Sequence, residues 1–431
     1  MKILFLHPNM PGQYKHLARI AAENPKNEVV FITLQRPNIS IPNVRKIEYV
    51  CTREPDTGCH QYLISMERAV LRAQEVWRVC KQLKSEGFVP DVIVGHFGWG
   101  DGLFLKDIFH GVPILCFMEF YYSAYASDIG FMKEFEEEGY PTVDDVARIR
   151  MKNALHLFNL ADTDWGITPT YFQLDRHPEP FHKKISVLHD GIDSDAVKPD
   201  PRATFTIPKK NLTFKAGDEV ITYISRNFEP YRGIHTFMRA ANIVLKERPN
   251  AHIIMVGGDG VSYGKKPPEG KTYRHMLLDE LKPDMSRIHA VGYLDYEEML
   301  KVLHISAAHV YLTVPFVLSW SMMEAMSAGC LMVCSDTLPV REVLTHEKNG
   351  LMVDFFSPED VAKKIIWGLE NKEQAREIRA NARQTILDQY ALNKVLPLHM
   401  QLINDLADRQ LPPAADAKIR AFNKRRHYAE K

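Results

Sequence analysis

Short apolar runs alternate with longer amphipathic stretches from the first residue onward. This alternation predicts buried parallel strands separated by helices that cover both faces of a sheet. In the first half, helices are expected over Gln61–Lys84 and Val143–Leu160. The strands expected there are Lys2–His7, Glu28–Leu34, Asp91–Gly95, Val112–Met118 and Asp164–Thr168.

The alternation stops at residues 193–217, which are rich in proline and charge, and then restarts. A helix is expected over Gly233–Lys246. The strands expected in this half are Val220–Ser225, His252–Val256, Val310–Thr313, Leu331–Cys334 and Gly350–Val353. The sequence therefore predicts an α/β fold of two doubly wound, Rossmann-like domains that face each other across a cleft, with ligands beyond the carboxyl ends of the strands.

The same pattern sets the expected domain boundaries. Residues 1–195 form the N-terminal domain, 196–217 the linker and 218–385 the C-terminal domain. Residues 386–431 are expected to form a helix that returns to the N-terminal domain, followed by a basic tail. Two domains of this size are ordinary for a chain of 431 residues.

Composition narrows the class of protein. Lys and Arg number 54 and Asp and Glu number 54, so the net charge is zero, which argues against a nucleic-acid binder held mainly by bulk charge and leaves room for a local basic pocket. The six cysteines contain no C-x-x-C pair, no apolar stretch approaches a membrane span, and the start lacks a leader pattern. We therefore expect a cytoplasmic protein. Lys424, Arg425 and Arg426 indicate either a solvated tail or weak contact with the inner face of an anionic membrane.

Two arginines carry the clearest chemical signal. Arg226 ends an expected strand, and Arg232 stands six residues later, immediately before Gly233 and a helix. Two guanidinium groups beside a helix N-terminus suit a diphosphate, because they offer charge-assisted hydrogen bonds. The alternative is a pair of surface arginines that flank a proline turn.

A second strand-to-helix junction lies in residues 313–329, TVPFVLSWSMMEAMSAG. The backbone N–H groups of Ser319, Trp320 and Ser321 are expected to point at a phosphate. Glu324 on the first helical turn is expected to hold the ribose hydroxyls of a nucleotide. The alternative is that Ser321 and Glu324 form a capping box that satisfies only the helix end.

Two glycine-containing turns are weaker candidates for the ligand site. Gly258, within VGGDG, follows an expected strand and lets a ligand approach the backbone. Gly12, within HPNMPGQY, ends the first strand and allows close passage to a phosphate or a sugar. An ordinary strand-to-helix turn explains Gly12 equally well.

These motifs, taken in order, make the second half resemble the retaining glycosyltransferases of the GT-B fold, family 4. His189–Asp193 is similar to the family's N-G-V-D turn, and the arginine pair to its Arg/Lys phosphate pair. EAMSAGCLMVCSD, which begins at Glu324, is similar to the family's E-A-M-x-x-G-x-P-V-V-x-S-D stretch. VGYL, which ends at Leu294, resembles the strand end beside the nucleobase.

The chain departs from the family pattern at Phe316, where the family has the first of two glutamates, which it places at the donor sugar. In the first half, the family often has a histidine near the donor sugar. Glu119 follows a strand at that place, and His96 follows the preceding strand. The alternative for His96 is a satisfied histidine in a turn.

The resemblance implies transfer of a sugar from a nucleotide-diphosphate sugar to an acceptor hydroxyl with retention, as by a hexosyltransferase in glycan or surface polysaccharide synthesis. Arg226 and Arg232 would neutralise the leaving diphosphate. The donor is a substrate, so no cofactor is expected, and no Asp-x-Asp pair predicts a metal. The alternatives are a catalytically silent nucleotide-sugar-binding or scaffold protein, suggested by Phe316, and another GT-B enzyme such as a sugar-nucleotide epimerase or a phosphorylase; no clear pyridoxal-binding lysine supports the last.

Overall fold

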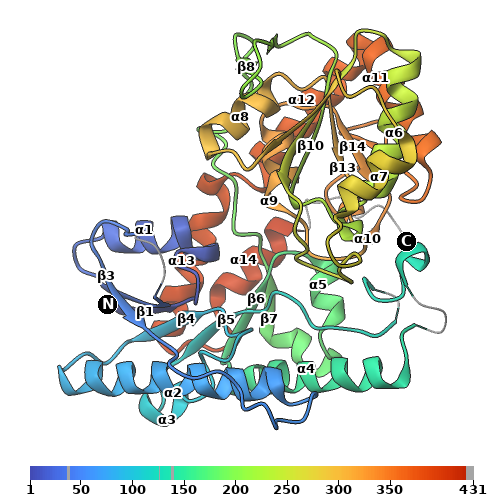
Figure 1. Ribbon diagram of the computed structural model, residues 1–431. Coiled ribbons are helices and arrows are strands. Elements are labelled where there is room, and N and C mark those ends of the chain that lie inside the picture. The colour runs from blue at the N-terminus through green and yellow to red at the C-terminus, as the bar shows by residue number, and fades with distance from the viewer. Residues whose placement is uncertain (36–38, 126, 137–139, 424–431) are drawn as a thin grey trace. The chain divides into compact units, whose positions relative to one another are not determined.

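The computed structural model describes residues 1–35, 39–125, 127–136 and 140–423. They form two compact units. The first unit holds Met1–Ala124, Pro141–Gly191 and the described chain from Leu392 onward, and the second holds Tyr125–Tyr140 and Ile192–Ala391. Each unit is a parallel, Rossmann-like α/β domain, as the strand–helix alternation predicts (Figure 1).

The first unit is built on a seven-stranded sheet in the order β3-β2-β1-β4-β5-β6-β7, with every neighbouring pair parallel. Its strands are β1 Lys2–Leu6, β2 Glu28–Leu34, β3 Val44–Tyr49, β4 Val92–Gly95, β5 Ile114–Phe117, β6 Trp165–Thr168 and β7 Ile185–Val187. Its helices are α1 Lys15–Glu23, α2 Ile64–Ser85, α3 Leu105–Ile108, α4 Val143–Asp162, α5 Tyr171–Arg176, α13 Leu392–Ala407 and α14 Ala414–Asn423, with 3-10 turns at Gly12–Tyr14 and Glu179–Lys184.

Both faces of this sheet are buried, which is why its strands read as continuous apolar runs. Successive side chains point to opposite faces, so Ile3 and Phe5 enter one core while Leu4 and Leu6 enter the other. The first core is closed by α1, α13 and α14, and the second by α2, α3 and α4 (Figure 1). The C-terminal helices therefore complete the hydrophobic core of the first unit.

The second unit is built on a six-stranded parallel sheet in the order β12-β11-β10-β13-β14-β15. Its strands are β10 Val220–Asn227, β11 His252–Gly258, β12 Ile288–Gly292, β13 Ala308–Tyr311, β14 Met332–Ser335 and β15 Leu351–Val353. Its helices are α6 Ile234–Glu247, α7 Tyr273–Leu281, α8 Tyr296–His304, α9 Trp320–Ser327, α10 Leu338–Arg341, α11 Pro358–Glu370 and α12 Lys372–Gln389, with 3-10 turns at Lys133–Phe135 and Pro230–Arg232.

Two segments differ from the expected division of the chain. The expected linker, 196–217, contains an antiparallel ribbon of β8 (Thr204–Thr206) and β9 (Thr213–Lys215), whose Phe205 and Phe214 are buried in the core of the second unit. Tyr125–Tyr140, expected in the N-terminal domain, belongs to the second unit, where Phe131 contacts the rings of Phe355 and Phe356.

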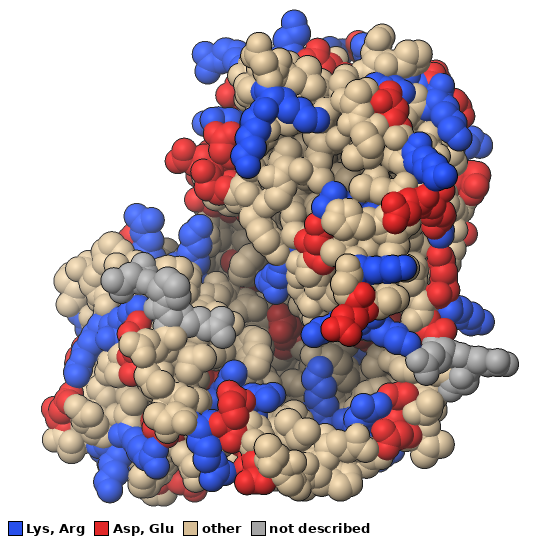
Figure 2. Space-filling view, viewed as in Figure 1, with Lys and Arg blue, Asp and Glu red and all other residues tan. Residues whose placement is uncertain are grey.

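The described surface carries both signs of charge. On the face shown in Figure 2, basic and acidic side chains are interspersed over both units, in keeping with the zero net charge. Among the described residues, every helix is too short or too polar to span a membrane. The basic tail residues that suggested membrane contact lie outside the described residues.

Candidate active site

A pocket of about 100 Å³ lies in the second unit, beside the ends of β10 and β13 and the start of α9. Strand ends of a parallel sheet meet at one edge, so residues from distant parts of the sequence converge there. The polar side chains that line it are Tyr223, Ser225, Arg226, Glu229, Arg232, Tyr263, Tyr311, Ser319 and Ser321. The structure therefore brings both predicted arginines and both predicted serines into one pocket.

Arg232 is held in a fixed position. Its Nη1 donates a hydrogen bond to Thr313 Oγ1 at 2.9 Å and a longer one to the Tyr311 hydroxyl at 3.4 Å. Gly233 follows with φ of 64°, and a Cβ there would lie 2.4 Å from Leu312, so only glycine lets the chain turn at this point. The guanidinium is thus oriented before any ligand binds.

Arg226 differs from Arg232 in its surroundings. It lies exposed near the end of β10 and makes no hydrogen bond or ion pair with any residue that the structure describes. Its charge remains open to an anion, while its position is less constrained than that of Arg232.

Glu229, between the two arginines, was missed in the sequence analysis. It is 1 % exposed, and its Oε2 accepts hydrogen bonds from the backbone N–H groups of Ser262 at 2.6 Å and Tyr263 at 2.9 Å. Burial raises the pKa of this carboxyl, and the two N–H groups and both arginines oppose that shift. Glu229 thereby fixes the loop that places the Tyr263 ring 5.8 Å from the guanidinium carbon of Arg232. The feature of the sequence that could have pointed to Glu229 is its place as an acidic residue between the two arginines.

The start of α9 differs from the expected phosphate-binding turn. Ser319 is the N-cap, and its Oγ accepts from the N–H of Ser321 at 3.2 Å. The Ser319 N–H donates to the hydroxyl of Tyr311 at 2.9 Å. Two of the three N–H groups predicted to bind phosphate are therefore engaged within the protein. The two serine hydroxyls lie 2.8 Å apart and line the pocket instead.

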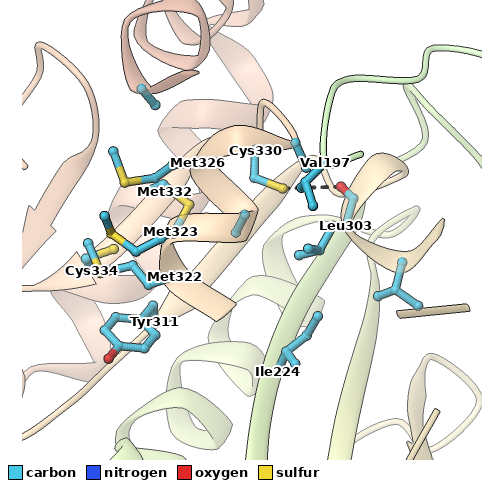
Figure 3. Close-up of a cluster of buried hydrophobic side chains, with 14 of the residues drawn as sticks. Val197, Ile224, Leu303, Tyr311, Met322, Met323, Met326, Cys330, Met332 and Cys334 are labelled. Atoms are coloured by element: carbon cyan, nitrogen blue, oxygen red, sulfur yellow. Dashed lines mark hydrogen bonds between the residues drawn. The ribbon is translucent and has the colours of Figure 1, made fainter. Parts of the chain in front are cut away.

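Buried sulfur-containing side chains hold α9 in place (Figure 3). Met322, Met323 and Met326 project from α9 into the hydrophobic core of the second unit. Beyond the helix, the Cys330 thiol donates to the carbonyl of Leu303 at 3.2 Å. Because the methionine face is buried, the serines at the helix start are fixed at the pocket.

Glu324 lies outside the group of residues that line this pocket. Its Oε1 accepts a hydrogen bond of 2.7 Å from the hydroxyl of Tyr296. The capping-box alternative is wrong, because Ser319 rather than Ser321 is the N-cap and Glu324 is too far into the helix to reach it. Trp320 is 45 % exposed and also lies outside the pocket lining.

Phe316 is buried in an aromatic cluster. Its ring centroid lies 5.0 Å from that of Tyr263 and 6.2 Å from that of Tyr231, both in edge-on arrangements. The Tyr231 hydroxyl donates to Asp128 at 3.0 Å. In place of a glutamate, the chain therefore has an apolar support behind Tyr263.

Gly258 and Leu294 lie outside the described pocket. A Cβ at Gly258 would lie 2.3 Å from the hydroxyl of Tyr293, so this glycine makes room for a tyrosine rather than for an open approach. Leu294 packs partly buried against the core of the second unit. Both residues have packing roles.

The first unit has its own cavity, of about 230 Å³, at the ends of β4 and β5. His96 and Glu119, the two candidates from this half, line it together, and His96 Nε2 lies 3.2 Å from Glu119 Oε2. Burial raises the pKa of Glu119, but the His96 hydrogen bond and the nearby histidines outweigh it and bring the pKa below its usual value. The cavity thus holds a carboxylate and a histidine in direct contact.

Gly12 makes room for the ring of His7, which packs against His96. Its φ is +51°, and a Cβ there would lie 2.5 Å from the ring of His7. The His7 ring packs edge-on against that of His96, with 5.4 Å between centroids, and burial lowers the pKa of His7 to about 3. Gly12 is therefore required for packing of a neutral histidine beside His96.

Across the described chain, the acidic, histidine and cysteine side chains nowhere gather into a group suited to a metal ion.

Comparison with known proteins agrees with this architecture. Residues 25–197 match the family described as Glycosyl transferase family 4 group, and residues 205–385 match Glycosyl transferases group 1. No curated protein matches the sequence.

Several solved structures share the fold. Sucrose-phosphate synthase from Thermosynechococcus elongatus superposes with a TM-score of 0.68 at 18 % identity, covering 95 % of this chain and 100 % of its own. HepE of Anabaena, solved in complex with UDP-glucose, gives 0.64 at 14 % identity, with 94 % and 99 % covered. A glycosyltransferase from Rickettsia africae gives 0.63 at 13 % identity, with 94 % and 98 % covered.

Proposed function

Because this chain belongs to the glycosyltransferases of the GT-B fold, we propose that it moves a sugar, as a hexosyltransferase, from a nucleotide-diphosphate sugar to an acceptor hydroxyl. The observation that carries the choice of donor is the pocket where Arg226 and Arg232 meet the hydroxyls of Ser319 and Ser321. The UDP-glucose bound by HepE supports a donor of this class.

In the proposed reaction, the diphosphate binds in the pocket of the second unit. Negative charge grows on the leaving oxygen as the bond to the sugar breaks, and Arg232, already oriented by Thr313, stabilises it without reorganising. Arg226 closes on the same diphosphate from its exposed position. A thermal-shift screen against UDP-, GDP- and ADP-sugars identifies the donor, because a ligand that binds the folded state raises the melting temperature.

Glu324 is proposed to hold the ribose hydroxyls of that donor. Its contact with the Tyr296 hydroxyl shows that the carboxylate accepts hydrogen bonds from an OH group. Glu324→Gln keeps the shape of the side chain and removes its charge. Nucleotide affinity should fall while the melting temperature stays within about 2 °C, and unchanged affinity would exclude this role.

The acceptor is proposed to bind in the cavity of the first unit, beside His96 and Glu119. The leaving phosphate oxygen takes the acceptor proton, and the product keeps the configuration of the donor. Proton NMR of fresh product from an α-linked donor tests this: an α-linked product is expected, and a β-linked product would overturn the mechanism. Glu119→Gln should slow the reaction, and a sugar adduct on Glu119 in mass spectrometry would indicate double displacement instead.

The reaction is proposed to need neither a metal ion nor another cofactor, because two arginines supply positive potential at the diphosphate. Activity should survive EDTA. Loss of turnover in EDTA that magnesium or manganese restores would contradict this.

A silent nucleotide-sugar-binding protein is the second candidate, favoured by the burial of Phe316 among Tyr231 and Tyr263. Donor binding without transfer or hydrolysis, across a panel of glycan acceptors, would support it.

For the active enzyme, we propose a cytoplasmic role in glycan or surface polysaccharide synthesis, with weak contact to the inner membrane face.

A further inference from the structure

The cavity of the first unit contains positive side chains that the proposed reaction leaves unused. Arg72 on α2 and Lys152 on α4 line the same 230 Å³ cavity as His96 and Glu119. Arg68 on α2 lines the cavity as well, so two separate helices contribute cations to one concave site.

Arg72 is half-buried, and it makes no hydrogen bond or ion pair with any residue in the described chain. Its charge acts on Asp101, which is buried and accepts a hydrogen bond from Tyr49. By contrast, Arg68 on the same helix is paired with Glu54 at 3.2 Å. Arg72 thus keeps its donors available at the cavity wall.

Glu119, the acid that lines the cavity, already has partners. It contacts His96 at 3.2 Å and accepts from Gln13 Nε2 at 3.4 Å. Its carboxylate is therefore directed at His96 and Gln13, and no ion pair joins it to Arg72.

Aromatic rings give the cavity an apolar surface next to these charges. Trp99 lies over His96, with 4.4 Å between ring centroids and an angle of 30° between planes. Lys152 Nζ lies 3.4 Å from the centre of the Tyr122 ring. A flat apolar surface beside these cations suits a ligand with one apolar face and one anionic group.

We infer that this cavity takes an acceptor sugar that carries an anionic group, a phosphate or a carboxylate. Arg72 and Lys152 hold the anion, and Trp99 supports the sugar ring. This inference rests on the proposed function in treating the cavity as the acceptor site, and its test reads binding rather than transfer.

In the test, the full chain is titrated with glucose 6-phosphate, glucuronate or glucose, and ligand-observed NMR measures the binding of each. At least one of the two anionic sugars should bind about tenfold more tightly than glucose. Arg72→Gln should weaken that binding by roughly tenfold to a hundredfold, the range for a hydrogen bond to a charged group. Lys152→Gln, an independent variant, should weaken it too, while glucose binding stays unchanged.

Two controls separate this cavity from the arginine pocket. Arg78→Gln removes an arginine on α2 that pairs with Glu75 and lies outside the cavity, so anion binding should not change. Arg232→Gln should weaken UDP binding and leave anionic-sugar binding intact.

Binding of both anionic sugars no tighter than glucose overturns the inference. The inference also fails if Arg232→Gln abolishes binding of the anionic sugar while Arg72→Gln leaves it intact, because the anion then binds in the second unit. If Arg72-dependent binding is found without any sugar transfer, the cavity is still a site for an anionic sugar, and only the proposed function, with the role of acceptor, fails.

Discussion

Truncation of Arg232 tests whether the pocket of the second unit performs the chemistry. In the structure this side chain makes two hydrogen bonds, to Thr313 and to Tyr311. Arg232→Ala leaves neither partner without a contact. Thr313 Oγ1 still donates to the carbonyl of Val314, and the Tyr311 hydroxyl still accepts from Ser319. The free energy of unfolding should therefore fall by only about 1–2 kcal/mol.

Turnover should fall much further. A donor aimed at charge that develops in the transition state is worth about 10²–10³ in rate, or roughly 3–4 kcal/mol of activation free energy. The assay measures transfer at saturating donor, UDP affinity by calorimetry and thermal unfolding on the same preparations. Arg341→Ala is the matched control, because Arg341 pairs with Asp336 outside the pocket. Turnover of Arg232→Ala within about threefold of the parent chain would refute the assignment of this pocket as the donor site.

Three further predictions concern stability. Gly12→Ala forces a Cβ to within 2.5 Å of His7 at a φ of +51°, so the free energy of unfolding in urea should fall by about 1–3 kcal/mol. Phe316→Ala should cost about 3–4 kcal/mol in the same assay, because it opens a cavity behind Tyr263; a loss below about 1 kcal/mol would mean that the ring is not packed as described. Burial lowers the pKa of His7 and His309 to about 3, so below pH 6.5 the unfolded chain binds protons that the folded chain does not. Stability should therefore fall as pH drops from 6.5 towards 3, by about 2 kcal/mol per histidine between pH 7 and 5, and pH-independent urea midpoints would contradict this.

The strands of the two sheets were predicted where both faces of the sheet are buried. Glu28–Leu34 and His252–Val256 read as apolar runs because their central side chains are buried on both faces of the sheet. Val44–Tyr49, Ile185–Val187 and Ile288–Gly292 were missed. The first is an edge strand with charged residues along it, and the second has three residues, too few for a periodic signal. The third is an edge strand that is only partly buried.

Some site residues could likewise be predicted from the sequence, and others could not. Arg226, Arg232 and Ser319 stand at strand ends and a helix start, so their order in the sequence already places them at one edge of a parallel sheet. Glu229 was missed, because its role depends on N–H groups of Ser262 and Tyr263, more than thirty residues away.

By itself, the sequence determined the α/β class, the two parallel sheets, the family resemblance and the pairing of two arginines near a helix start. These follow from local periodicity and spacing, which the chain carries without reference to its fold. Only the tertiary structure decided that Ser319 caps α9, that Tyr296 contacts Glu324 and that His96 meets Glu119. Each of these contacts depends on which side chains from separate helices, strands and loops come together in space. The packing of those elements decides this, and local sequence patterns do not record it.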